Sequence, residues 1–274
     1  MLSRLRSILA HLNQFSRAKM STTVHNTNEA CCTIPPVLSE YEAKGTIKPY
    51  AGFQKVYITG PSTSENAIVA IFDIFGFFPQ TQQGADILAS TLNTTVYMPD
   101  FFEPDSAFDI SRYPPKTDED KAAVQAFFGS TASPSAAITK LKAFGEALKS
   151  NGVKRVGVYG MCWGGKVAIA SGGEATPFYA VSLLHPAMLS AEDAEKLTVP
   201  LAIYVSHDEP IAEYHKIVDI ISKKSFADKN DAKNYDNMFH GWAAARSNLK
   251  NEENRKEFED VYGRLSTFFR RTLV

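Results

Sequence analysis

Short apolar segments alternate with amphipathic segments along most of the chain. The short segments are rich in β-branched and aromatic residues, which is typical of strands buried in a sheet. The longer segments place apolar residues three or four positions apart, which predicts helices with one buried face. The strands predicted in this way are 55–59, 67–74, 94–98, 156–159, 179–184, 201–206 and 232–235. The predicted helices are 81–92, 119–128, 134–150, a run opening at 166, 211–225 and 252–272.

Strands that alternate with helices predict an α/β fold, in which a mostly parallel central sheet is covered by helices on both faces. Residues 53–274 are predicted to form one such domain, because no segment has the composition of a linker. Residues 20–52 are polar, interrupted by proline and weakly periodic, so they are predicted to be an irregular lead-in. The segment 101–116 is rich in Phe, Asp and Pro and is predicted to be a long loop that covers a site.

The most informative stretch is RVGVYGMCWGGK, residues 155–166, where a strand ends abruptly at a helix. It contains the pattern Gly-x-Cys-x-Gly-Gly, the form of a nucleophile elbow with sulfur in place of the usual serine oxygen. Cys162 would lie at a helix N-terminus, where the backbone N–H groups and the helix dipole favour a thiolate. The alternative is a buried cysteine that only fills space in a glycine-rich turn.

A cysteine nucleophile needs a base, and the base needs an acid that orients it. Asp208 follows the predicted strand 201–206, and His240 lies in NMFHGW before the last helix. The order nucleophile, acid, histidine is that of α/β hydrolases. We therefore predict a triad of Cys162, Asp208 and His240. His185 and His207, which also follow strands, are interpreted as structural histidines whose ring nitrogens are satisfied.

The motifs YGMCWGGK, SHDE and FHGWAAAR, with the lead-in CCTIPP and the turn FDIFGF, resemble the dienelactone hydrolase family in its fungal form. The resemblance runs from about Cys31 to the C-terminus. It implies a single α/β-hydrolase domain that hydrolyses small lactones or esters without a cofactor or a metal, as family members hydrolyse dienelactone to maleylacetate. The intermediate would be a thioester on Cys162.

The resemblance also implies roles for residues around the nucleophile. The backbone N–H groups of Trp163 and Ile74 would receive the oxyanion. Bacterial members carry a glutamate where this chain has Asp73 and use arginines to hold the substrate carboxylate, which makes Arg246 a candidate. Asp73 would either oppose the thiolate of the resting enzyme or only accept backbone N–H groups in the FDIFGF turn.

Composition restricts the partners of the protein. The 29 basic and 30 acidic residues give a formal net charge of −1 and are evenly mixed, which argues against a nucleic-acid partner. No apolar run is long enough to span a bilayer.

Three cysteines, two of them adjacent at Cys31 and Cys32, cannot form a disulfide framework and favour a reducing compartment. The expected partner is a small lactone or ester, and the chain would be a monomer or a homodimer.

Residues 1–19 contain four basic residues, no acidic residue and an apolar helical face. This is the pattern of a mitochondrial transit peptide. The prediction is therefore a cytoplasmic protein, or a mitochondrial one if this leader is used, with Met20 as a second possible start.

Other functions fit the same residues. The triad could serve an acyltransferase or a thioesterase, which would be distinguished by whether water or an added amine or alcohol takes the acyl group. A non-catalytic ligand-binding relative would keep the pocket and show no turnover. A redox-sensing protein would need Cys162 alone and neither Asp208 nor His240.

Overall fold

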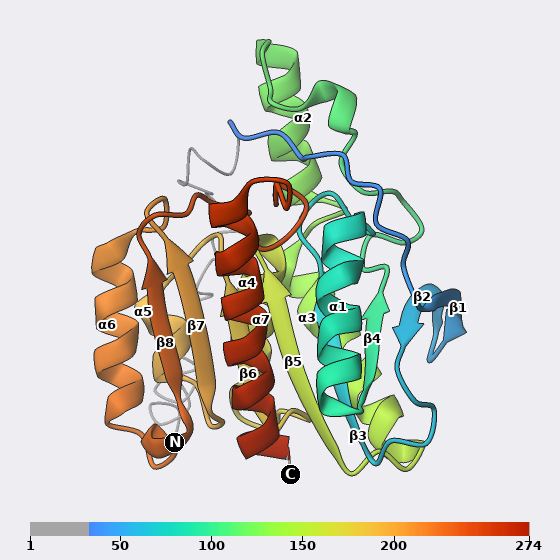
Figure 1. The fold of residues 1–274 in the computed structure, drawn as a ribbon, viewed down its shortest axis with the longest axis vertical. Helices are drawn as coiled ribbons and strands as arrows, with labels where there is room; N and C mark the ends of the chain where they lie inside the picture. Colours follow the sequence, from blue (N-terminus) through green and yellow to red (C-terminus); the bar gives the residue numbers. More distant parts are fainter. Residues whose placement is uncertain (1–32, 274) are drawn as a thin grey trace, which may run out of the picture.

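The computed structural model describes residues 33–273, which form a sheet flanked by helices. Within this range the sheet has eight strands in the order β1-β2-β4-β3-β5-β6-β7-β8. The pairs β1·β2 and β2·β4 are antiparallel and the other pairs are parallel (Figure 1). The strands are β1 (Thr46–Tyr50), β2 (Phe53–Thr59), β3 (Asn66–Ile71), β4 (Thr95–Pro99), β5 (Arg155–Met161), β6 (Ala180–Leu184), β7 (Leu201–Ser206) and β8 (Asp231–Tyr235).

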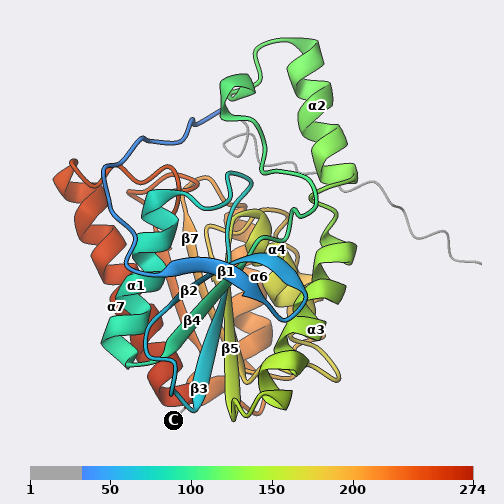
Figure 2. The same ribbon diagram turned by 90° about the vertical axis from the view of Figure 1, so that its right-hand side faces the viewer.

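Helices cover both faces of this sheet, so the predicted fold class is confirmed. One face packs against α1 (Pro79–Leu92) and α7 (Glu252–Leu273), which contact each other. Figure 2 shows these two helices on one side and the other long helices on the opposite side. That second layer consists of α3 (Pro134–Ser150), α4 (Trp163–Ser171), the short α5 (Ala191–Glu195) and α6 (Ile211–Ser222).

The register of the parallel strands brings their carboxyl ends to one edge. Ile71 of β3 pairs with Gly160 of β5, and Met161 pairs with Leu184 of β6. The residues that follow these strands therefore meet at this edge, where sites in such sheets are built. The helix α2 (Asp118–Gly129) stands beyond the same edge, apart from the two helical layers (Figures 1 and 2).

Two local features of the structure differ from the sequence predictions. The lead-in contains the strand β1, which pairs with β2 through a tight turn, so β1 forms the edge of the sheet. The turn has left-handed backbone at Ala51 (φ 48°) and Gly52 (φ 91°), a conformation that Gly52 adopts without strain. The helix α5 was not predicted, since five residues show no period. The leader 1–19, Cys31 and Cys32 lie outside the described residues.

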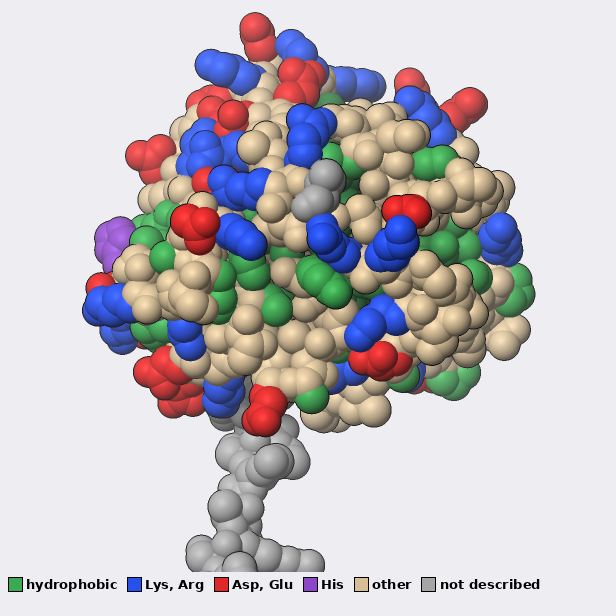
Figure 3. All heavy atoms as spheres, turned by 90° about the horizontal axis from the view of Figure 1, so that it is seen from below, with side chains coloured by type: hydrophobic (Ala, Val, Ile, Leu, Met, Phe, Trp, Pro, Cys, Tyr) green, Lys and Arg blue, Asp and Glu red, His purple; other side chains and the backbone are tan. Residues whose placement is uncertain are grey.

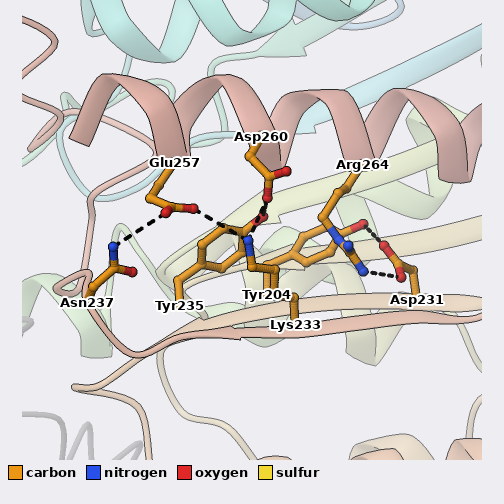
Figure 4. A network of polar contacts seen from close by, with 8 residues as sticks. All are labelled: Tyr204, Asp231, Lys233, Tyr235, Asn237, Glu257, Asp260 and Arg264. Atoms are coloured by element: carbon orange, nitrogen blue, oxygen red, sulfur yellow. Dashed lines mark hydrogen bonds and ion pairs between the residues drawn. The ribbon is translucent and has the colours of Figure 1, made fainter. Parts of the chain in front are cut away.

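Polar contacts between the last strands and α7 fix the two ends of the loop 236–251, which carries His240. Lys233 Nζ and the Tyr235 hydroxyl both donate to Asp260 of α7, at 2.8 and 2.7 Å (Figure 4). Asp231 accepts from Arg264 and from the buried Tyr204 hydroxyl, at 2.6 and 2.7 Å. The loop is thus held between a strand and a helix that are locked together.

Figure 3 shows the face of the molecule at the amino ends of the parallel strands, opposite the edge where their carboxyl ends lie. Basic and acidic side chains are interspersed there, and apolar side chains occur in small groups. This agrees with the near-zero formal charge of the chain. No helix within residues 33–273 is long and apolar enough to cross a membrane.

Candidate active site

Cys162 occupies a strained turn between β5 and α4. Its backbone has φ 53° and ψ −116°, values that a residue other than glycine rarely adopts. Backbone hydrogen bonds hold this conformation: the Cys162 N–H donates to Leu184 O at 3.1 Å, and its carbonyl accepts from the N–H groups of Ala187 at 2.9 Å and Gly165 at 3.0 Å. The side chain is completely buried. The elbow predicted from the sequence is therefore present as a backbone conformation.

Two glycines are required by the close approach of the backbone around this turn. A Cβ on Gly160 would lie 1.9 Å from Gly164 O, and a Cβ on Gly164 would lie 2.4 Å from Ile71 O. Both distances are far below van der Waals contact, and the atoms met are backbone atoms that cannot move aside. The elbow can form only with glycine at these positions.

We expect Gly160→Ala to lower the free energy of unfolding by about 3 kcal/mol or more, because the added methyl forces the elbow apart. Gly263→Ala is the matched control, since a Cβ there meets nothing within 4 Å and lies inside α7. It should raise stability by about 1 kcal/mol through helix propensity. Urea unfolding of both variants measures the difference. Equal stabilities would mean that the elbow is not as tightly packed as the distances indicate.

His240 is buried, and its ring pairs with a carboxylate. Nδ1 lies 2.6 Å from Glu209 Oε1, and both side chains are fully excluded from solvent. Glu209 also accepts a hydrogen bond from the Ser206 backbone N–H at the end of β7. A carboxylate on Nδ1 fixes the ring orientation and the tautomer with the proton on Nδ1.

The acid on the imidazole in the structure is Glu209, whereas the predicted acid, Asp208, contacts the backbone of His240 and the neighbouring histidine. Asp208 Oδ2 accepts from the backbone N–H of His240 at 2.7 Å, and Oδ1 lies 3.3 Å from Nε2 of the half-exposed His207. The turn after β7 points the side chains of Asp208 and Glu209 in different directions, and the longer side chain of Glu209 reaches the imidazole. The sequence signal was the Asp-Glu doublet itself, of which only the first member was chosen.

His185, at the end of β6, lies against His240. The ring centroids are 5.3 Å apart with an interplanar angle of 74°, an edge-to-face arrangement. His185 is fully buried, and neither of its ring nitrogens bonds to another described residue. Burial, followed by the nearby His240 and Arg246, holds the pKa of His185 well below its usual value. The prediction of a satisfied structural histidine is wrong for His185.

Asp73 and Arg246 are both buried at the same edge. Asp73 Oδ1 accepts from the Phe75 N–H at 2.9 Å, and Oδ2 accepts from the Ala245 N–H at 3.4 Å, so the carboxylate joins the turn after β3 to the loop of His240. Ile74, the next residue, accepts at its carbonyl from the Phe108 N–H at 2.9 Å.

Arg246 lies against a pair of aromatic rings that contact each other edge-to-face. Its guanidinium carbon lies 5.0 Å from the Phe75 ring centroid and 5.4 Å from that of Tyr113. Nη2 donates to the Tyr113 hydroxyl at 2.7 Å, and Nε donates to the Ile34 carbonyl. The long loop 101–116 and the segment after residue 32 thus both contribute to the surroundings of this cation.

The remaining predicted groups are backbone donors. Trp163 is the first residue of α4, so its N–H has no acceptor one turn earlier in the helix.

Within the described range, no group of three His, Cys, Asp or Glu side chains is placed to hold a metal ion.

Residues 54–273 match the family model described as "Dienelactone hydrolase family". The chain belongs to the dienelactone hydrolase family. An AIM2 family protein of Schizosaccharomyces pombe is 33% identical over 84% of this chain and 92% of its own length. A carboxymethylenebutenolidase homolog of Xenopus tropicalis is 32% identical over 51% of this chain and 55% of its own length.

The fold is shared with solved structures of the same family. A putative dienelactone hydrolase from Klebsiella pneumoniae superimposes with a TM-score of 0.62 at 15% identity, covering 83% of this chain and 98% of that one. Membership of the dienelactone hydrolase family makes this protein an enzyme that hydrolyses ester bonds, as the sequence motifs predicted.

Proposed function

We propose that the protein hydrolyses small lactones or esters through a covalent thioester on Cys162. The observation that carries the proposal is the strained Cys162 elbow at the same sheet edge as the buried His240–Glu209 pair. Strain of about 1–3 kcal/mol at one residue persists only where the surrounding structure enforces it, and it clusters at catalytic positions.

The first half of the reaction forms the thioester. The thiol proton of Cys162 first passes to Nε2 of His240, directly or through the Asp73 carboxylate, which makes His240 an imidazolium. The Cys162 thiolate attacks the carbonyl carbon, and the backbone N–H groups of Trp163 and Ile74 receive the charge that develops on the carbonyl oxygen. Each such donor lowers the barrier by ~3 kcal/mol. The C–O bond then breaks, and the leaving alkoxide takes a proton from the imidazolium of His240.

The second half hydrolyses the thioester. His240, with its proton on Nδ1 held by Glu209, accepts a proton from water at Nε2, and the water oxygen bonds to the thioester carbon. The C–S bond breaks as the tetrahedral intermediate collapses, which releases the acid and regenerates Cys162. In this scheme Glu209 takes the part predicted for Asp208, and Asp208 positions the loop through the backbone of His240.

Arg246 supports an anionic substrate. Arg246 is 1% exposed, and its guanidinium, which lies against two rings, is a fixed positive charge close to His185 and hence to the His240 pair. Guanidinium groups bind carboxylates with two parallel hydrogen bonds. We therefore assign small esters or lactones that carry a carboxylate as the preferred substrates.

Intact-mass spectrometry during turnover tests the proposal. A panel of small lactones and aryl esters should give a transient adduct of the acyl mass, and digestion should place it on Cys162 and not on Cys31 or Cys32. Steady turnover without an adduct on Cys162, under rapid acid quench, would contradict the thioester mechanism.

We also propose that Asp73 restrains the nucleophile of the resting enzyme. In Asp73→Asn, which keeps an oxygen acceptor for the turn, the negative charge near the elbow is lost, and Cys162 should react faster with iodoacetamide at neutral pH. Turnover should fall, because an anionic substrate would no longer displace the carboxylate and free it to take the thiol proton. The alkylation rate of the Cys162 peptide, followed against pH, is the measurement. Superimposable profiles with normal folding would assign Asp73 to the turn alone.

A further inference from the structure

His185 lies in a turn whose backbone forms hydrogen bonds with the backbone of Cys162. The residue before it, Leu184, accepts the Cys162 N–H, and the N–H of Ala187, two residues after it, donates to the Cys162 carbonyl. Its own N–H donates to Tyr204 O at 2.7 Å, which holds a backbone with φ 37°. The imidazole is therefore carried by a turn that is bonded to the backbone of the nucleophile, and its ring contacts His240.

Two buried polar atoms of His185 lack partners. Neither ring nitrogen bonds to another described residue, although the side chain is fully buried. An unsatisfied buried polar group destabilises the folded state. An apolar side chain of the same size would pack against His240 without this cost, so packing alone does not explain why this position carries a ring with two nitrogens. A molecule that enters the site and bonds to the two nitrogens does explain it.

Water fits this position better than a charged group. With its pKa well below the usual value, His185 is neutral at neutral pH, and a neutral imidazole has one donor nitrogen and one acceptor nitrogen. Water can bond to either. The ring also lies edge-to-face on His240, the base that the second half-reaction requires.

We propose that His185 holds the water molecule that hydrolyses the thioester. The inference rests on the proposed function and concerns its second half only. The held water loses its proton to His240 Nε2 while its oxygen bonds to the thioester carbon. The C–S bond breaks, the sulfur regains the proton, and the products are the free acid and the Cys162 thiol. His185 itself gains and loses no proton.

Burst kinetics with 4-nitrophenyl acetate separate the two halves of the reaction. In His185→Phe, which keeps a ring but has no nitrogen, the nitrophenol burst should keep its rate, and the following steady rate should fall about 100-fold, the loss typical of one positioned hydrogen-bonding group. The acetyl adduct on Cys162 should accumulate. Hydroxylamine, a nucleophile that does not depend on a held water, should restore turnover.

A second variant covers the case in which phenylalanine is not tolerated at φ 37°. His185→Gly adopts this backbone without strain and leaves a space of imidazole size. Its slow deacetylation should be accelerated by added imidazole, to which wild type and His185→Phe should not respond. Thermal unfolding verifies that each variant is folded.

The outcomes distinguish this inference from the proposed function. A normal steady rate in both variants, or equal slowing of burst and steady phases, would overturn the role of His185 while leaving the thioester mechanism in place. A wild-type enzyme with no burst and no adduct on Cys162 would overturn both.

Discussion

Cys162→Ala should abolish ester hydrolysis, with kcat/KM reduced by more than about 10⁴-fold. The sulfur forms the covalent bond to the acyl group in the proposed mechanism, and an alanine methyl cannot. Because the site is fully buried and alanine is smaller, the fold should survive with a loss of ~1 kcal/mol in the free energy of unfolding. Hydrolysis of an aryl ester and urea unfolding measure the two quantities.

Cys162→Ser is the informative comparison. A serine hydroxyl fits the elbow but is far less ionised at neutral pH, so only a small residual activity is expected. Full activity in Cys162→Ala would exclude the thioester mechanism, and another nucleophile would have to be sought.

The sequence alone was sufficient to predict the helices and strands that form the layers of the fold. The segments 201–206 and 134–150 were predicted as a strand and a helix with the bounds that the structure shows. Both have strong signals: an unbroken apolar run in one case, and a proline start with helical spacing in the other. The Cys162 elbow was predicted because the glycine requirement is local and steric. The backbone at Gly160 and Gly164 confirms that reason.

The predictions that were wrong concern contacts between distant segments. The strand β1 is mostly exposed, so its residues lack the apolar alternation that identifies a half-buried strand, and pairing with β2 decides its conformation. His185 was interpreted as satisfied because a sequence does not show which polar atoms find partners. Only the packing of β6 against the loop of His240 reveals that its nitrogens have none among the described residues.

The choice between Asp208 and Glu209 shows the same limit on a smaller scale. Both follow β7, and either could reach a histidine from the opposite loop. The angle of a turn of four residues, together with one additional methylene, determines that Glu209 meets the ring and Asp208 meets the backbone N–H. Turn geometry of this kind depends on the tertiary structure and not on residue type.

Glu209→Gln should reduce kcat by about 10³- to 10⁴-fold, which is the second large effect. The amide oxygen can still accept the Ser206 N–H, which leaves the amide NH₂ facing His240. An NH₂ group donates, so it stabilises the tautomer in which Nδ1 is the acceptor and the proton lies on Nε2. The nitrogen that must accept a proton from water is then already protonated.

Asp208→Asn is the matched control, because it changes the neighbouring acid in the same isosteric way. The asparagine oxygen can still accept the His240 backbone N–H, now without charge assistance, so a loss of about 1 kcal/mol and thus about tenfold or less in kcat is expected. Steady-state kinetics of both variants, with ¹⁵N chemical shifts of the His240 ring to report the tautomer, decide between the two acids. The opposite order of effects, with Asp208→Asn the more damaging and the His240 tautomer unchanged in Glu209→Gln, would return the orienting role to Asp208 and make the contact at 2.6 Å a structural one.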